Sequence, residues 1–206
     1  MFAGSVAPPG ADSPQLDGRT RRAATSRGRI VKAMLALVGE GVISPTAEQI
    51  AARAGVGLRT VFHHFRDMDA LYIELTAEVA RRFEAMAAPF KSPDWQGQLA
   101  ELIDRRLTAY EKLLPLKRAG DVHRHRSKVL QASHAASQAA LRARLQSLLP
   151  AARAADAAAF EALDLTLSLD SWQRLRDHQR LSPDAARATI THLVALILAA
   201  PKEPDA

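Results

Sequence analysis

The side chains best suited to do chemistry in this sequence are cationic, and they gather in its first third. Between Arg19 and Arg66 there are nine Lys or Arg residues and two Asp or Glu residues, a net charge of +7. The other residues carry a net charge of −1, so this segment holds the whole basic excess of a chain with net charge +6. A concentrated positive field favours a polyanion, most often nucleic acid. A solvated basic face without a partner is the competing interpretation.

Catalytic and metal-binding chemistry finds little support in the sequence. The 206 residues include no cysteine, which excludes a disulfide framework, a thiolate zinc site and a cysteine nucleophile. Gly-x-Ser-x-Gly, His-Glu-x-x-His and phosphate-loop motifs are also missing. His123 and His125 would point about 200° apart on a helix, so they could not share one ion there. We therefore expect no enzyme activity, no cofactor and no metal site.

Short helices are predicted to position the basic segment. The first covers about residues 23–40, where apolar side chains recur at the spacing of one buried helix face. Next, Thr46 and Gln49 form a capping-box pattern, in which each side chain satisfies a backbone amide of the other residue. This pattern predicts that a short second helix begins after Thr46 and covers residues 47–54.

The third helix is expected at residues 57–65, immediately after a tight turn. Gly55 supplies the positive φ that this turn requires. Asp67 is a plausible N-cap for a longer fourth helix at about residues 68–88. Two short helices joined by a glycine turn, after a longer first helix, indicate a helix-turn-helix, and the local charge of +7 points the motif toward DNA.

The third helix would be the one that enters the major groove. Leu58, Arg59 and His63 are expected on its exposed side. Arg59 could donate to guanine O6 and N7, His63 could donate or accept, and Leu58 could contact a thymine methyl. Phe62 could belong to this surface or to the core. The residues expected in the core are Ile50, Val56, Val61 and Phe65.

The rest of the chain is also predicted to be helical. Apolar stripes at helical spacing occupy residues 99–114 and 122–148, with Pro115 separating them. A further helix is expected at about 154–179, although residues 163–169 also alternate as a strand would; alanine-rich flanks favour the helix. This helix is apolar on two sides, which either dimerisation or ordinary core burial explains. The last helix is expected to start at Pro183, with Ser182 as its N-cap.

Together these patterns predict an all-α protein with a three-helix helix-turn-helix domain and a larger C-terminal helical domain. We expect a disordered, basic-ended arm at residues 1–22, the DNA-binding domain at 23–66, and a larger helical domain at 67–206. The first residues lack the pattern of a signal peptide, and the longest apolar stretch is far shorter than the roughly 20 residues of a membrane span. A cytoplasmic location is therefore expected.

The segment from Thr46 to Tyr72 resembles the N-terminal domain of the TetR family of transcriptional regulators. The resemblance extends over about residues 27–75. It departs from the family at Gly57, where Ser is common, at Phe62, where Tyr is usual, and at Met68, where Lys is typical. The matching landmarks are Thr46, Ile50-Ala51, Ala54-Gly55-Val56, Thr60, Phe62, His64-Phe65 and Leu71.

The resemblance implies a homodimeric regulator, most commonly a repressor, that binds a palindromic operator in double-stranded DNA. Thr60 and His64 match positions that contact phosphate in the family, and Thr46 offers its hydroxyl and a helix N-terminus to a phosphate. Arg21 and Arg22, in the arm, could follow phosphates or enter a minor groove, as could Arg19, Arg27 and Arg29.

The resemblance also implies that the last two helices form the dimer and that the middle helices enclose a small-molecule effector. Candidate effector-binding residues are Trp95, Tyr110, His134 and Trp172, with His123 and His125 as further candidates. An architectural or division-associated DNA-binding protein of the same fold, without an effector, is the alternative function.

Overall fold

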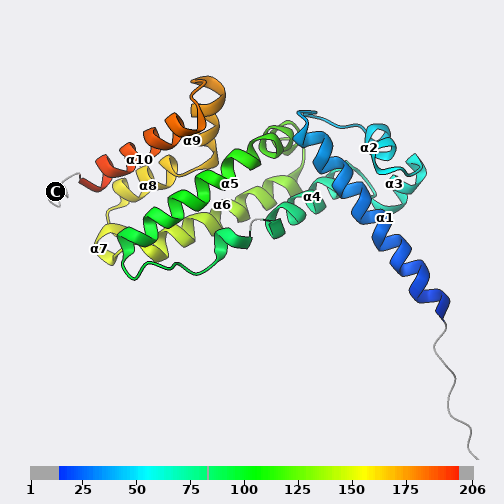
Figure 1. The fold of residues 1–206 in the computed structure, drawn as a ribbon, viewed down its shortest axis with the longest axis horizontal. Helices are drawn as coiled ribbons and strands as arrows, with labels where there is room; N and C mark the ends of the chain where they lie inside the picture. Colours follow the sequence, from blue (N-terminus) through cyan, green and yellow to red (C-terminus); the bar gives the residue numbers. More distant parts are fainter. Residues whose placement is uncertain (1–13, 83, 200–206) are drawn as a thin grey trace, which may run out of the picture.

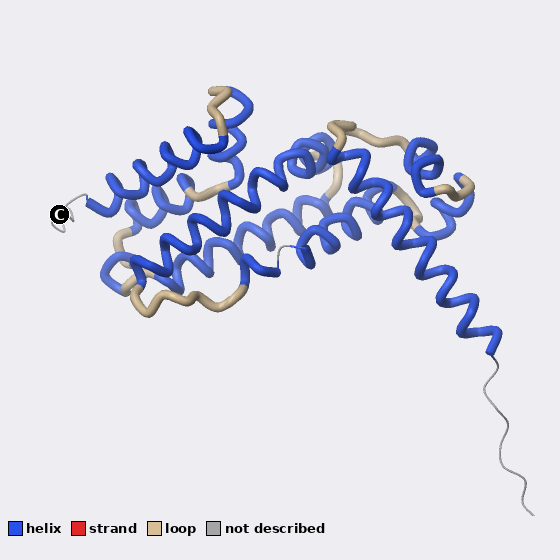
Figure 2. Tube along the Cα trace, viewed as in Figure 1, coloured by secondary structure: helices blue, strands red, loops and turns tan. Residues whose placement is uncertain are grey.

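The structure is a computed structural model that describes residues 14–82 and 84–199, and it confirms the all-α fold across these ranges. A small head of short helices is joined to an elongated helical body (Figure 1). Figure 2 shows only helices and connecting loops in the described part. None of the helices in these two ranges is long and apolar enough to cross a membrane.

The head packs around one apolar cluster. Its elements are α1 (Pro14–Gly39), α2 (Ala47–Ala54), α3 (Leu58–His64) and the first turns of α4 (Met68–Arg82). Ile30 and Met34 of α1 are fully buried in this cluster with Ile50 of α2. Ala119 and Leu130 belong to the same cluster although they lie in the body, so the head and the body share part of one core.

The body is built on two long helices with shorter ones packed at the end remote from the head (Figure 1). Tyr110 and Trp172 are almost completely buried in its core, which is separate from the cluster of the head. The elements of the body are the 3-10 helix η1 (Glu84–Ala87), α5 (Trp95–Arg124), α6 (Lys128–Leu148), α7 (Ala151–Ala154), α8 (Ala157–Thr166), α9 (Leu169–Gln173), the π-helix η2 (Arg174–His178) and α10 (Pro183–Ala199).

Helix α1 begins at Pro14, so residues 14–22 of the predicted disordered arm are helical. Proline suits the first helical position, and the Gln, Leu, Arg and Ala residues that follow are strong helix formers. Residues 1–13 lie outside the described ranges, so the disorder expected there stays a prediction.

Helix α5 runs through Pro115, which the sequence pattern had predicted to separate two helices. Proline removes one backbone hydrogen bond from a helix interior. Buried Leu114 and Ala119, before and after Pro115, anchor the helix to the core and offset that loss. The break falls instead at Ser127, whose hydroxyl accepts a hydrogen bond from the Leu130 amide and caps α6.

Residues 154–179, which the sequence predicts as one helix, are mostly helical but are divided into the separate segments α8, α9 and η2. Ser168 begins α9 because its hydroxyl accepts a hydrogen bond from the Ser171 amide at 3.0 Å. The preceding carbonyl, that of Leu167, accepts from the buried Tyr110 hydroxyl at 2.9 Å. In an uninterrupted helix the Leu167 carbonyl would instead accept a hydrogen bond from the Ser171 amide, four residues later.

Candidate nucleic-acid interface

The start of α2 and the turn after it are set by the local interactions that the sequence predicted. The Gln49 amide donates to the Thr46 hydroxyl at 3.3 Å, and the Thr46 amide donates to the Gln49 side chain at 2.9 Å. Gly55 adopts a left-handed conformation with φ of 63° and ends the helix. Because residues with a Cβ atom rarely adopt that φ, a substitution at Gly55 would strain the turn between α2 and α3.

Helix α3 divides into one buried and one exposed side. Val61 and Phe65, the residue just after the end of α3, are each 2% exposed and pack into the head. Leu58 is 38% exposed, and Phe62 is 51% exposed, so Phe62 belongs to the outer surface and not to the core. The four residues Leu58, Arg59, Phe62 and His63 are the exposed side chains of α3, and we call them the reading face.

Thr60 and His64 lie at the margin of the reading face and are half-buried. Burial lowers the pKa of His64, and the nearby His63 and Arg27 lower it further. His64 is therefore neutral at pH 7 and can donate or accept one hydrogen bond at its ring nitrogens. Thr46 is exposed at the start of α2, where its hydroxyl still has a proton to donate.

Arg27 holds the head together, a role that differs from the phosphate contact considered for it. Its guanidinium donates to the His64 carbonyl at 2.9 Å and to the Glu74 carboxylate at 2.8 Å. It also lies 4.4 Å from the centre of the Phe65 ring. These contacts connect α1 to α3 and α4, so Arg27 supports the reading face from behind.

The cations of the head differ in whether a carboxylate neutralises them. Both terminal nitrogens of Arg53 lie 2.6 Å from the Glu40 carboxylate oxygens, and Arg66 lies 2.9 Å from Asp67. Arg59 has no ion-pair partner among the residues that the structure describes. The reading face therefore presents a positive charge that no carboxylate of the described residues neutralises.

Arg21 and Arg22 lie on the part of α1 that extends away from the rest of the head (Figure 1). Their side chains are outside the described part of the structure, so their contact with DNA stays a prediction. Arg29, further along α1, is exposed.

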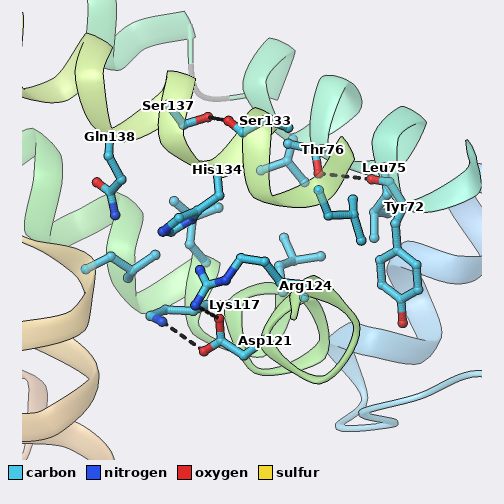
Figure 3. Close-up of a pocket in the computed structure, with 16 residues that line it drawn as sticks. Tyr72, Leu75, Thr76, Lys117, Asp121, Arg124, Ser133, His134, Ser137 and Gln138 are labelled. Carbon is cyan, nitrogen blue, oxygen red and sulfur yellow. Dashed lines mark hydrogen bonds and ion pairs between the residues drawn. The ribbon is translucent and has the colours of Figure 1, made fainter. Parts of the chain in front are cut away.

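A cavity of about 180 Å³ lies in the body where α4, α5 and α6 meet (Figure 3). Of the four predicted effector-binding residues, His134 lines it. Tyr110 borders a different hollow, beside α8, and Trp172 is buried with its indole nitrogen donating to Glu111 at 3.1 Å. Trp95 packs against the core of the body. The three aromatic candidates, Trp95, Tyr110 and Trp172, therefore did not predict the position of this cavity, because they pack in the core of the body.

Sequence reasoning did not single out Tyr72, which lines the cavity and also faces the head. Its ring centre lies 4.5 Å from that of His123, whose Nε2 is 3.1 Å from the Ser44 hydroxyl. Burial raises the pKa of Tyr72 to about 12 and lowers the pKa of His123, so both are neutral at pH 7. His125 is exposed, and the described residues contain no group of three metal-ligating side chains.

Comparison with known proteins supports the interpretation of the head. Residues 30–75 match the family model described as bacterial regulatory proteins, tetR family. A crystal structure of a transcriptional regulator from Rhodococcus sp. Rha1 has a similar fold, with a TM-score of 0.63 and 18% sequence identity over 84% of this chain and 95% of that chain. A search of curated proteins produced no match.

Proposed function

We propose that this chain is a DNA-binding transcriptional regulator and that it acts as a homodimeric repressor, because residues 30–75 match the tetR family model. In this proposal two copies bind a palindromic operator, and a small-molecule effector releases them. Functionally, residues 23–66 read DNA, and residues 67–206 dimerise and bind the effector. The observation that carries the proposal is the exposure of the reading face on the side of α3 opposite Val61 and Phe65.

The reading face has the chemistry needed to recognise bases in a major groove. Arg59 can form two hydrogen bonds to guanine, and His63 can form one to a base edge. Leu58 and Phe62 offer apolar surface to thymine methyl groups. Contacts with phosphates position a reading helix without specifying sequence. The side chains suited to make such contacts are those of Thr46, Thr60 and His64 and, on α1, Arg21 and Arg22.

A dimer is supported by the outer surface of α8 and α10. Leu165 of α8 is 67% exposed, and Leu193 and Leu196 of α10 are 41% and 55% exposed. The two helices pack against each other, and these exposed leucines offer apolar surface that a second copy can cover. Two reading helices related by a two-fold axis then fit two half-sites of a palindrome.

Release by an effector is supported by the position of the cavity next to the head. Tyr72 lines the cavity and contacts His123, which contacts Ser44 shortly before the N-cap of α2. A ligand that binds better to one arrangement of α4 and α5 shifts the population toward that arrangement. Because Ser44 precedes α2, the shift alters the spacing of the two reading helices.

The test is selection of bound sequences from a random DNA library, followed by footprinting across genomic DNA of the source organism. The proposal expects one palindromic motif, protected at few sites and lost in an Arg59→Ala, His63→Ala variant that still folds. Protection of many sites without a shared palindrome contradicts it and favours the architectural alternative.

A further inference from the structure

The chemical class of the effector can be inferred from the wall of the cavity, and this inference rests on the proposed function. We infer that the cavity between α4, α5 and α6 binds an uncharged compound with a single ring and one hydroxyl or carbonyl group. Three properties carry this inference: the size of the cavity, the pairing of the charges around it, and two polar side chains of α6 that have no hydrogen-bond partner among the described residues.

The size of the cavity suits a ligand of about one ring. An apolar cavity of about 150 Å³ accepts benzene, whereas drug-sized ligands occupy about 300 Å³ or more. At about 180 Å³, this cavity has room for a six-membered ring with small substituents. Most of its surface is apolar, and the aliphatic lining residues are Leu75, Val79, Leu113, Leu116, Leu130 and Leu169.

The charges around the cavity already neutralise one another. Lys117 Nζ lies 2.9 Å from an Asp121 oxygen and 2.8 Å from an Asp170 oxygen, and its side chain is only 6% exposed. Arg124 pairs with the other oxygen of Asp121 at 3.0 Å. Two cations thus face two carboxylates, and Figure 3 shows Lys117, Asp121 and Arg124 together at one end of the cavity.

A charged ligand would find no free counter-ion in this arrangement. It would have to leave water and also break one of the existing pairs, and breaking a pair that involves the buried Lys117 is costly. An uncharged ligand avoids both penalties, so the electrostatics of the wall select against carboxylates and ammonium ions.

Two side chains of α6 supply the polar contacts for such a ligand. His134 and Gln138 are one turn apart and line the cavity. Their side chains make no hydrogen bond to any residue in the described ranges. Figure 3 shows His134 directed toward Lys117 and Arg124. Burial, followed by the charge of Arg124, lowers the pKa of His134, so its ring is neutral at pH 7. A neutral imidazole and an amide can each donate and accept, which suits a hydroxyl or carbonyl.

The test compares three probes of nearly equal size by calorimetric titration of the full chain at pH 7.5. These are 4-methylbenzyl alcohol, 4-methylbenzoate and 4-methylbenzylammonium. We expect the alcohol to bind at least about tenfold more tightly than either ion, a difference of about 1.4 kcal/mol. Tighter binding of either ion, or no saturable binding of the alcohol, overturns the inference.

Variants locate the binding in the cavity. A Cβ atom added at Gly120, which lines the cavity, meets no heavy atom within 4 Å, so a larger side chain can start there without a clash and Gly120→Leu adds bulk at the cavity. We expect this variant to lose binding of the alcohol. Gly28→Leu, at a helical glycine of α1 with equally open surroundings, is the matched control and should retain it. Equal binding by both variants would place the ligand elsewhere and overturn the inference.

The polar contacts are tested separately with His134→Leu. This variant should weaken binding of the alcohol by about threefold to tenfold, the effect of losing one hydrogen bond. It should leave binding of p-xylene, a probe of similar shape without a polar group, unchanged or stronger. Weakening of both probes alike would contradict the role assigned to His134.

Operator binding in the same samples separates this inference from the proposed function. If the alcohol binds in the cavity without releasing DNA, the ligand class stands and release by an effector fails. If DNA binding is sequence-specific but the alcohol does not bind, the regulator stands and the ligand class is wrong.

Discussion

The reading face and the cavity treat positive charge in opposite ways. Arg59 stands exposed on α3 without an ion-pair partner in the described residues. Lys117, beside the cavity, is held by two carboxylates and almost closed off from solvent. An unpaired exposed cation keeps its attraction for a distant polyanion, whereas a paired one contributes almost no field beyond its neighbours. This contrast supports both proposals, DNA binding by the head and binding of an uncharged small molecule by the body.

Under the proposed function, the largest expected effect comes from separating the two copies of the dimer, because each head alone would read only half of a palindromic operator. Leu165→Glu combined with Leu196→Glu places charge on the exposed face of α8 and α10. We expect a monomer in analytical ultracentrifugation and operator affinity reduced by at least about 100-fold, since the second head no longer benefits from attachment to the first.

The control for this pair is Val129→Glu, at a position that is 55% exposed and lies on α6 instead. It should remain dimeric. If the double variant also stays dimeric and binds the operator normally, the dimer does not use α8 and α10.

The next largest effect on operator binding should come from removing a cation of the head that has no ion-pair partner, compared with removing one that is paired. Arg59→Ala should weaken operator binding by about 1–3 kcal/mol and relax preference at one base position. Arg53→Ala is the matched control, because Glu40 already neutralises Arg53, and it should have a much smaller effect. Binding isotherms on single-base operator variants measure both quantities, and an unchanged preference in Arg59→Ala would remove it from base recognition.

A similar comparison applies to Arg27, which supports α3 from behind. Arg27→Ala should lower the free energy of unfolding by about 1 kcal/mol, because it removes a hydrogen bond to the His64 carbonyl and a partly exposed ion pair with Glu74. Arg59→Ala should leave that free energy nearly unchanged. Urea titration followed by circular dichroism checks both, and equal destabilisation would contradict the difference in roles.

Replacing Arg21 and Arg22 with Gln should change salt dependence more than sequence preference. Each lost phosphate contact lowers the slope of log K against log salt by about 0.9. Titrations at several NaCl concentrations measure this slope. The slope of an Arg187→Gln variant, in which a body cation that pairs with Asp104 is removed, should match the unchanged protein. An unaltered slope in the double variant would exclude the arm from phosphate binding.

The smallest effect concerns the body alone. Hydrogen bonds from the Ser92 hydroxyl and from the Lys91 and Ser92 amides hold the pKa of Glu101 at about 2. Because this folded-state pKa is below the ordinary value, Glu101 stabilises the protein above about pH 4.3 and loses that contribution as the pH falls toward 2.

Glu101→Gln tests this dependence. The free energy of unfolding, measured by urea titration, should decline less steeply between about pH 5 and pH 3 in the variant than in the unchanged protein. Parallel pH profiles would show that Glu101 does not contribute in this way. Operator binding at pH 7 should be the same in both proteins.

The head could be predicted from sequence to a greater extent than the body. The capping box of Thr46 and Gln49 and the left-handed turn at Gly55 appear where the sequence placed them. The exposed position of Arg59 and the burial of Val61 also follow from helical spacing. The body differed at Pro115, where α5 continues, and at Ser168, where a helix breaks. In both places, contacts with distant residues outweigh the local preference.

The candidate sites show the same division. His134 was among the effector candidates because of its chemistry, but the sequence could not show that it shares a cavity with Tyr72. Phe62 could have been core or surface, and only the packing of α3 against the head makes it exposed.

By itself, the sequence determined the features that depend on neighbours within a few residues: the helix caps, the glycine turn, the buried stripe of each helix and the basic charge of the head. The tertiary structure decided which cations are free, because the partners lie far along the chain, as Glu74 does from Arg27 and Asp170 from Lys117. Pairing over such separations depends on how whole helices pack, and no local pattern records it.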